Sequence, residues 1–150
     1  MKKIYLGADS AGYELKELLK QHLSEGGYTV VDVGTDSTAS CHYPIFAAAV
    51  ARGVQGDAGS LGILVCGTGI GMSMAAGKFR GIRAAVCGDT FSARMTRMHN
   101  DANVLCIGAR VIGPGLARDI VDLFLTTEFE GGRHATRVDM ITALEEGKEI

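Results

Sequence analysis

The 150-residue chain is 47% hydrophobic and 21% charged, which is the size and balance of a single globular domain over residues 1–150. Its formal net charge of −2, with no run of basic residues, argues against a nucleic-acid partner. The N-terminal apolar stretch covers only residues 4–8, too short for a signal peptide or a membrane span, so we expect a cytoplasmic protein that binds no membrane.

The first half of the chain alternates short apolar runs with amphipathic segments. Residues 4–8 predict a buried strand, and the leucines at helical spacing over 15–23 predict the helix that follows it. Residues 29–33, rich in β-branched side chains, predict a second strand. Pro44 suits the first turn of a second helix, whose apolar stripe continues to Val50.

The second half repeats this alternation. Strands are predicted at 61–66, 82–86 and 103–107, and helices at 73–79, 89–98, 114–126 and 136–146. Parallel strands need long crossovers, which helices of this length provide. The pattern predicts an α/β fold: a Rossmann-like three-layer domain with a five-stranded parallel sheet, helices on both faces and a C-terminal helix. Ligands of such folds bind beyond the C-terminal ends of the strands.

A glycine-rich turn, Cys66-Gly67-Thr68-Gly69-Ile70-Gly71, follows the third predicted strand. Its uncovered backbone amides predict a cradle for negative charge, beside a thiol that a helix N-terminus would activate and that Thr68 can hydrogen-bond. A dinucleotide motif would need Gly or Ala where Met72 stands, and a P-loop would need Ser or Thr where Phe79 stands. A base beside an oxyanion hole suits proton abstraction next to a carbonyl, but a cysteine there equally suits acyl transfer.

The four cysteines predict no metal centre. Cys41, Cys66, Cys87 and Cys106 form no CxxC pair and no cluster with histidine, so we expect neither zinc nor a disulfide framework. Cys87 and Cys106 are interpreted as small buried hydrophobes.

Several polar positions allow both a structural and a functional interpretation. Asp9 ends a buried strand and is either an N-cap or a site residue. His99, followed by Asn100, is either a cap at a helix C-terminus or a catalytic group. Arg133 and Arg137 stand four residues apart, a spacing that suits a phosphate but is also common on surface helices.

Taken in order, the motifs resemble those of the type B ribose-5-phosphate isomerases and the related galactose-6-phosphate isomerase subunits. The resemblance covers nearly the whole chain and is carried by GAD at 7–9, YP at 43–44, CGTGIG at 66–71, KFRGIRA at 78–84, HNDANV at 99–104 and GGRH at 131–134. It implies an aldose-ketose isomerase that interconverts ribose 5-phosphate and ribulose 5-phosphate through a cis-enediolate, with no metal or other cofactor. The same chemistry on a tetrose or tetrulose 4-phosphate, allose 6-phosphate or galactose 6-phosphate is the nearest alternative. A cysteine acyl-transfer enzyme and a nucleotide-binding module are more remote ones.

The resemblance also implies roles for individual residues. Cys66 would be the base and Thr68 its assistant, with the amides of Gly67, Gly69, Ile70 and Gly71 holding the enediolate oxygen. His99 would open the sugar ring, and Asp9 and Asn100 would orient hydroxyls. The phosphate clamp would fall on Arg110, Arg133 and Arg137, and Tyr43 would line the pocket.

Two expectations concern the substrate and the assembly. The family's ribose-phosphate isomerases usually have Asp-His after the first strand, whereas this chain has Asp9-Ser10, which resembles relatives that act on tetrose phosphates. His99 precedes the fifth predicted strand and Cys66 ends the third, so the two should lie at opposite edges of the sheet. We therefore expect a homodimer or a dimer of dimers, with active sites shared between subunits.

Overall fold

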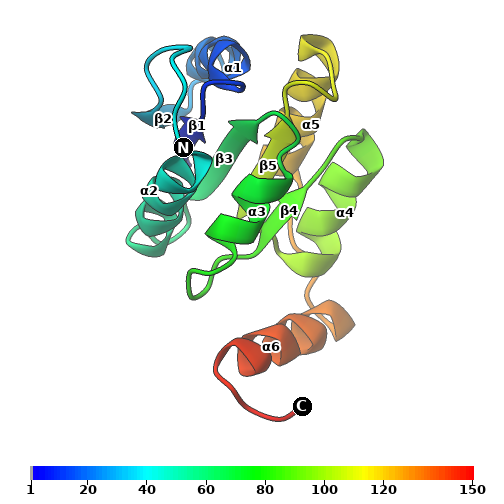
Figure 1. Cartoon of the computed structure of the whole chain (residues 1–150). Coiled ribbons are helices and arrows are strands. Elements are labelled where there is room, and N and C mark those ends of the chain that lie inside the picture. Colours follow the sequence, from blue (N-terminus) through cyan, green and yellow to red (C-terminus); the bar gives the residue numbers. More distant parts are fainter. Residues whose placement is uncertain (1) are drawn as a thin grey trace.

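A five-stranded parallel sheet forms the centre of the computed structural model, which describes residues 2–150 (Figure 1). The strands lie in the order β2-β1-β3-β5-β4, and all four pairings are parallel. Their bounds are β1 (Lys3–Ala8), β2 (Thr29–Gly34), β3 (Leu61–Cys66), β4 (Ala84–Val86) and β5 (Val104–Gly108). All residues of the central strands β3 and β5 are buried, as expected of strands covered on both faces.

Six helices accompany the sheet: α1 (Tyr13–Glu25), α2 (Tyr43–Gln55), α3 (Ile70–Ala76), α4 (Thr90–Asn100), α5 (Pro114–Thr126) and α6 (Arg133–Glu145). One core cluster joins α1, α4 and α5 to one face of the sheet, and a second joins α2 and α3 to the other face. The predicted three-layer Rossmann-like fold is confirmed. The C-terminal helix α6 lies away from the sheet, below α4 in the view of Figure 1. Within residues 2–150, no helix has the length and apolar character needed to cross a membrane.

Local backbone chemistry explains where the elements depart from their predicted bounds. Helix α3 begins at Ile70, earlier than predicted, because Gly69 takes a left-handed conformation with φ 80° and serves as its N-cap. Helix α6 begins at Arg133, three residues early, after Gly132 with φ 56°. Strand β4 is shorter than predicted, since the side chain of Asn103 accepts the Arg83 amide hydrogen at 2.8 Å just before the strand begins.

Candidate active site

The glycine-rich turn lies at the C-terminal edge of the sheet, where β1, β3 and β5 end side by side. The amide of Asp9 donates to Val65 O at 3.2 Å, which ties the end of β1 to β3. The amides of Ala109 and Arg110 donate to the carbonyls of Cys66 and Gly67 at 2.8 and 3.0 Å. We name the residues gathered at this edge the thiol cluster: Asp9, Ser10, Tyr43, the turn 66–71, and Arg110.

The sulfur of Cys66 receives a backbone hydrogen bond. The amide of Gly69 donates to Cys66 Sγ at 3.1 Å, and the cysteine is only 6% exposed. The expected hydrogen bond from Thr68 to the sulfur is absent within the described residues, where Thr68 Oγ1 accepts the amide of Ile70 at 3.2 Å. The turn folds back on itself, so its own amide provides the positive end of a dipole next to the sulfur.

Close packing requires two of the glycines in this turn, Gly69 and Gly71. A Cβ on Gly69 would lie 3.0 Å from the backbone of Ile107 on β5, and its positive φ would be strained for any other residue. A Cβ on Gly71 would lie 2.6 Å from the ring of Tyr43. Tyr43 is therefore packed directly against the turn.

Two other cysteines have thiols that stay protonated at neutral pH. Burial, with a smaller contribution from Asp89, raises the pKa of Cys87 to about 11. Burial also raises the pKa of Cys106, as do the nearby Cys66 and Cys87. Both are buried hydrophobes, as predicted. Cys66 differs from them in receiving an amide donor.

The remaining members of the thiol cluster surround the turn. Asp9 Oδ1 accepts the Gly12 amide at 3.0 Å, and Gly12, not Asp9, is the N-cap of α1. Ser10 follows Asp9 and is partly exposed. The Arg110 side chain passes 3.6 Å from where a Cβ on Gly67 would stand, which places its guanidinium beside the turn.

The other predicted site residues lie at the opposite edge of the sheet. Helix α4 runs back from the C-terminal edge, so His99 and Asn100 in its last turn lie near the start of β5. Arg133 and Arg137 are on the first turns of α6, which contacts α4. We name His99, Asn100, Arg133 and Arg137 the distal cluster.

The length of β5 separates the two clusters. Cys66 pairs with Gly108 and Gly62 pairs with Val104, so four residue steps, about 13 Å, separate the level of the thiol from the start of β5. His99 lies beyond that start. Within one chain, Cys66 and His99 therefore do not come together. This separation was predicted from the sequence.

The end of α4 is held rigidly by two arginines. Asp101 takes the left-handed conformation with φ 46° as the C-cap. Its carboxylate oxygens accept from Arg97 at 3.2 Å and Arg83 at 3.3 Å, and its carbonyl accepts from Arg83 Nε at 2.9 Å. These arginines also line a hollow of about 610 Å³ at this edge, where Asp101 already pairs with both of their charges.

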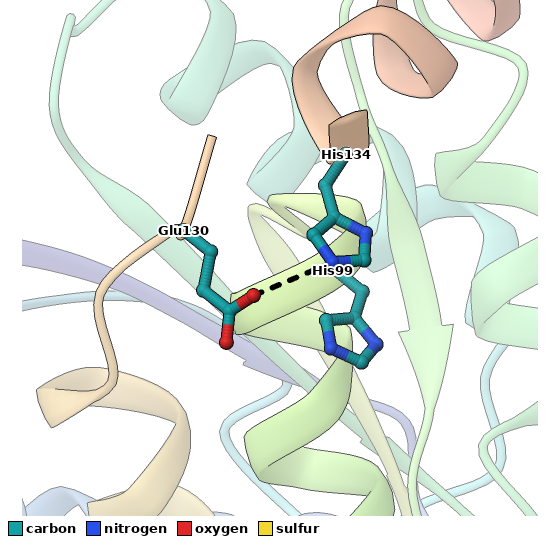
Figure 2. Close-up of side chains that lie close together, drawn as sticks. All are labelled: His99, Glu130 and His134. Carbon is teal, nitrogen blue, oxygen red and sulfur yellow. Dashed lines mark ion pairs between the residues drawn. The ribbon is translucent and has the colours of Figure 1, made fainter. Parts of the chain in front are cut away.

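Sequence reasoning missed two neighbours of His99, which Figure 2 shows with it. The rings of His99 and His134 stack with centroids 4.1 Å apart and an interplanar angle of 9°. Glu130 Oε2 lies 3.3 Å from His134 Nε2, and no hydrogen bond reaches that buried nitrogen within residues 2–150. The GGRH motif contained His134, but nothing in the sequence indicated that it lies against His99.

These three side chains form a group whose possible ligand atoms lie within 4.8 Å of one another in the described chain. Their arrangement suits a metal ion poorly. A zinc ion lies about 2.0–2.1 Å from each imidazole nitrogen and in the plane of each ring, whereas an ion shared by two stacked rings would lie between their planes. The charges of Arg133 and Arg137 also act on His134 and oppose a cation.

Comparisons with known proteins agree with this arrangement of motifs. A family model described as Ribose/Galactose Isomerase matches residues 4–141. The chain belongs to the ribose/galactose isomerase family. It is 51% identical over 146 residues to ribose-5-phosphate isomerase B of Escherichia coli K12, an alignment that covers 97% of this chain and 98% of that relative. It is also 46% identical to D-erythrulose-4-phosphate isomerase of Pectobacterium atrosepticum, covering 94% and 93% of the two chains.

Solved structures of ribose/galactose isomerase family members share the fold over almost the full length. The ribose-5-phosphate isomerase B of Clostridium thermocellum superposes with a TM-score of 0.95 at 50% identity, covering 97% of this chain and 98% of that one. The Mycoplasma genitalium enzyme with bound ribulose-5-phosphate superposes with a TM-score of 0.93 at 40% identity, covering 96% of each chain.

Proposed function

We propose that this chain is an aldose-ketose isomerase that interconverts ribose 5-phosphate and ribulose 5-phosphate, with residues 1–150 as one catalytic domain. The observation that carries the proposal is the Gly69 amide on Cys66 Sγ at 3.1 Å, in a turn beside Asp9, Tyr43 and Arg110. Membership of the ribose/galactose isomerase family and the names of the similar proteins support the same activity.

The reaction follows from a thiolate beside backbone donors. The Cys66 thiolate takes the C2 proton of the open-chain aldose, and the electrons move into a cis-enediolate. The amides of the turn stabilise the charge on its oxygen. The resulting thiol returns the proton to C1, while a proton passes between the two oxygens, so the aldehyde becomes a ketone with no change in composition. Thr68, whose hydroxyl caps the Ile70 amide, holds the turn in shape beside the sulfur.

The distal cluster has side chains suited to opening the sugar ring and binding phosphate, two tasks that the thiol cluster of one chain does not complete alone. Ribose 5-phosphate is mostly a closed furanose, so a group must donate a proton to the ring oxygen while the anomeric hydroxyl loses one. His99 suits that step, with Asn100 beside it orienting hydroxyls as Asp9 does at the thiol cluster. Arg133 and Arg137 project from one face of α6 and, together with Arg110, suit a phosphate.

A second copy of the chain would unite the two clusters. In a two-fold dimer, the thiol cluster of one chain faces the distal cluster of the other, and the symmetry completes two sites at once. The separation of Cys66 from His99 within one chain supports this arrangement. We propose a homodimer, or a dimer of dimers, in the cytoplasm, where a reducing environment keeps Cys66 free.

A tetrose phosphate is the second candidate substrate. Ser10 provides a hydroxyl where the family's ribose-phosphate isomerases usually have an imidazole, and one similar protein is named D-erythrulose-4-phosphate isomerase. The test is kcat/KM measured for four-, five- and six-carbon sugar phosphates. The proposal expects the highest value for ribose 5-phosphate. A tetrose phosphate preferred by more than tenfold would replace it as the substrate, and no isomerisation of any sugar would overturn the activity.

A further inference from the structure

We propose that His134 is a positioning residue that fixes the imidazole of His99 for opening the sugar ring. This inference rests on the proposed function, because it needs His99 to act on a cyclic sugar phosphate. It assigns a task to a histidine that the enediolate chemistry at Cys66 does not use.

The stack restricts the His99 ring from one side. His99 is in the last turn of α4 and His134 in the first turn of α6, and their rings lie nearly parallel at 4.1 Å (Figure 2). A ring packed face to face in this way cannot rotate about its Cβ–Cγ bond without breaking the contact. The two nitrogens of His99 are therefore held in one plane relative to the sheet edge.

His134 is itself held firmly in place. Its side chain is 7% exposed, and its amide donates to Gly131 O at 3.0 Å. The segment before α6 is tied to α4, because the amide of Glu130 donates to Met98 O at 3.1 Å. This bond links Glu130 to the residue next to His99. The contacts that hold His134 in place therefore also connect α6 to the end of α4.

The charge state of His134 suits this task. Burial lowers the pKa of His134, and so do His99, Arg133 and Arg137, while Glu130 opposes them. His134 is then neutral near pH 7, so its ring brings no positive charge against the face of the His99 ring.

The test is a double-mutant cycle on ribose 5-phosphate isomerisation. His134→Ala in the parent enzyme is expected to lower kcat about tenfold, below the roughly 10²-fold cost of a full 1 Å misplacement, with KM changed less than about twofold. His134→Ala added to His99→Ala is expected to cost less than about twofold, because the group it positions is already gone. His134→Phe restores a flat ring and is expected to regain kcat to within about threefold of the parent.

The controls separate positioning from loss of structure. Asp139→Asn, an exposed change on the same helix, is expected to leave kcat unchanged. In NMR spectra, His134→Ala should shift the ring protons of His99, since the ring current of the stacked imidazole disappears. The same tenfold loss in the His99→Ala background, or no loss in the parent, would overturn the positioning role. A parent that fails to isomerise any sugar phosphate would instead overturn the proposed function, while the NMR shift would still report the stack.

Discussion

The separation of the two clusters predicts that two strongly impaired variants will complement each other. Cys66→Ala removes the base from the thiol cluster, and His99→Ala removes the ring-opening group from the distal cluster. Each variant alone should form dimers in which both sites lack one group. A mixed dimer would have one site with the intact Cys66 of one chain and the intact His99 of the other, and a second site with neither.

The size of the recovery follows from this geometry. Equal amounts of the two variants, exchanged to equilibrium, give one half mixed dimers by random pairing, and each mixed dimer has one intact site of two. The expected activity is therefore about one quarter of that of the same amount of parent enzyme. If Cys66 and His99 acted within one chain, no intact site would form at any mixing ratio.

The assay measures ribulose 5-phosphate formation after the two variants are mixed, with exchange followed separately by mass spectrometry on chains of different isotope content. Mixing Cys66→Ala with Cys66→Ala/His99→Ala is the matched control, because its mixed dimers contain no intact site. Exchange to one half mixed dimers with activity no higher than this control would refute the shared-site reasoning.

Three further predictions follow from other parts of the molecule. Ser10→His should raise kcat/KM for ribose 5-phosphate about fivefold, since a charged hydrogen bond to phosphate contributes on the order of 1 kcal/mol. The gain should grow as the pH falls through about 6.5, where the imidazole becomes charged. Unchanged kinetics at every pH would contradict this prediction. Asp32→Asn should lower the free energy of unfolding by about 1 kcal/mol in urea titrations at pH 7, because the 1% exposed Lys16 loses a carboxylate at 2.7 Å but keeps Glu17 at 3.0 Å, and Asp32 is itself partly open to solvent. Burial raises the pKa of Asp32, but the hydrogen bonds from Lys16, Lys20 and the Gly34 amide outweigh burial, so the pKa in the folded state is lowered. The stabilisation by Asp32 should be complete above about pH 4 and be lost as the pH falls through the lowered pKa. A variant as stable as the parent at pH 7 would refute this prediction. Dialysis against EDTA should leave turnover unchanged, and activity lost to EDTA and restored by zinc or manganese would contradict the proton shuttle.

Local patterns predicted the elements and the thiol cluster well. The apolar run before Cys66 predicted a buried strand, and the glycines after it indicated a turn at the edge where ligands bind. The separation of Cys66 from His99 followed from the direction of parallel strands alone. These features depend on residues that are close together in the sequence, so a local sequence pattern can predict them.

Local sequence patterns did not predict the contacts between residues that are far apart in the chain. The strand order β2-β1-β3-β5-β4 depends on which faces of distant segments fit together. The stack of His99 on His134 joins residues that are 35 positions apart, and no periodicity in either segment indicates it. The hydrogen bond predicted from Thr68 to Cys66 is not formed within the described residues: the Gly69 amide donates to the sulfur, and Thr68 Oγ1 accepts the Ile70 amide.

The measurement that tests the account most directly is the ribose 5-phosphate kinetics of Cys66→Ala. The account predicts that kcat falls by at least about 10²-fold, the lower end of the range for a positioned general base, with the unfolding transition unchanged. Cys87→Ala removes a buried thiol that burial holds protonated, with a pKa of about 11, and should keep kcat within about twofold of the parent. If Cys66→Ala turned over within about tenfold of the parent enzyme, Cys66 would not be the base that moves the proton between C2 and C1.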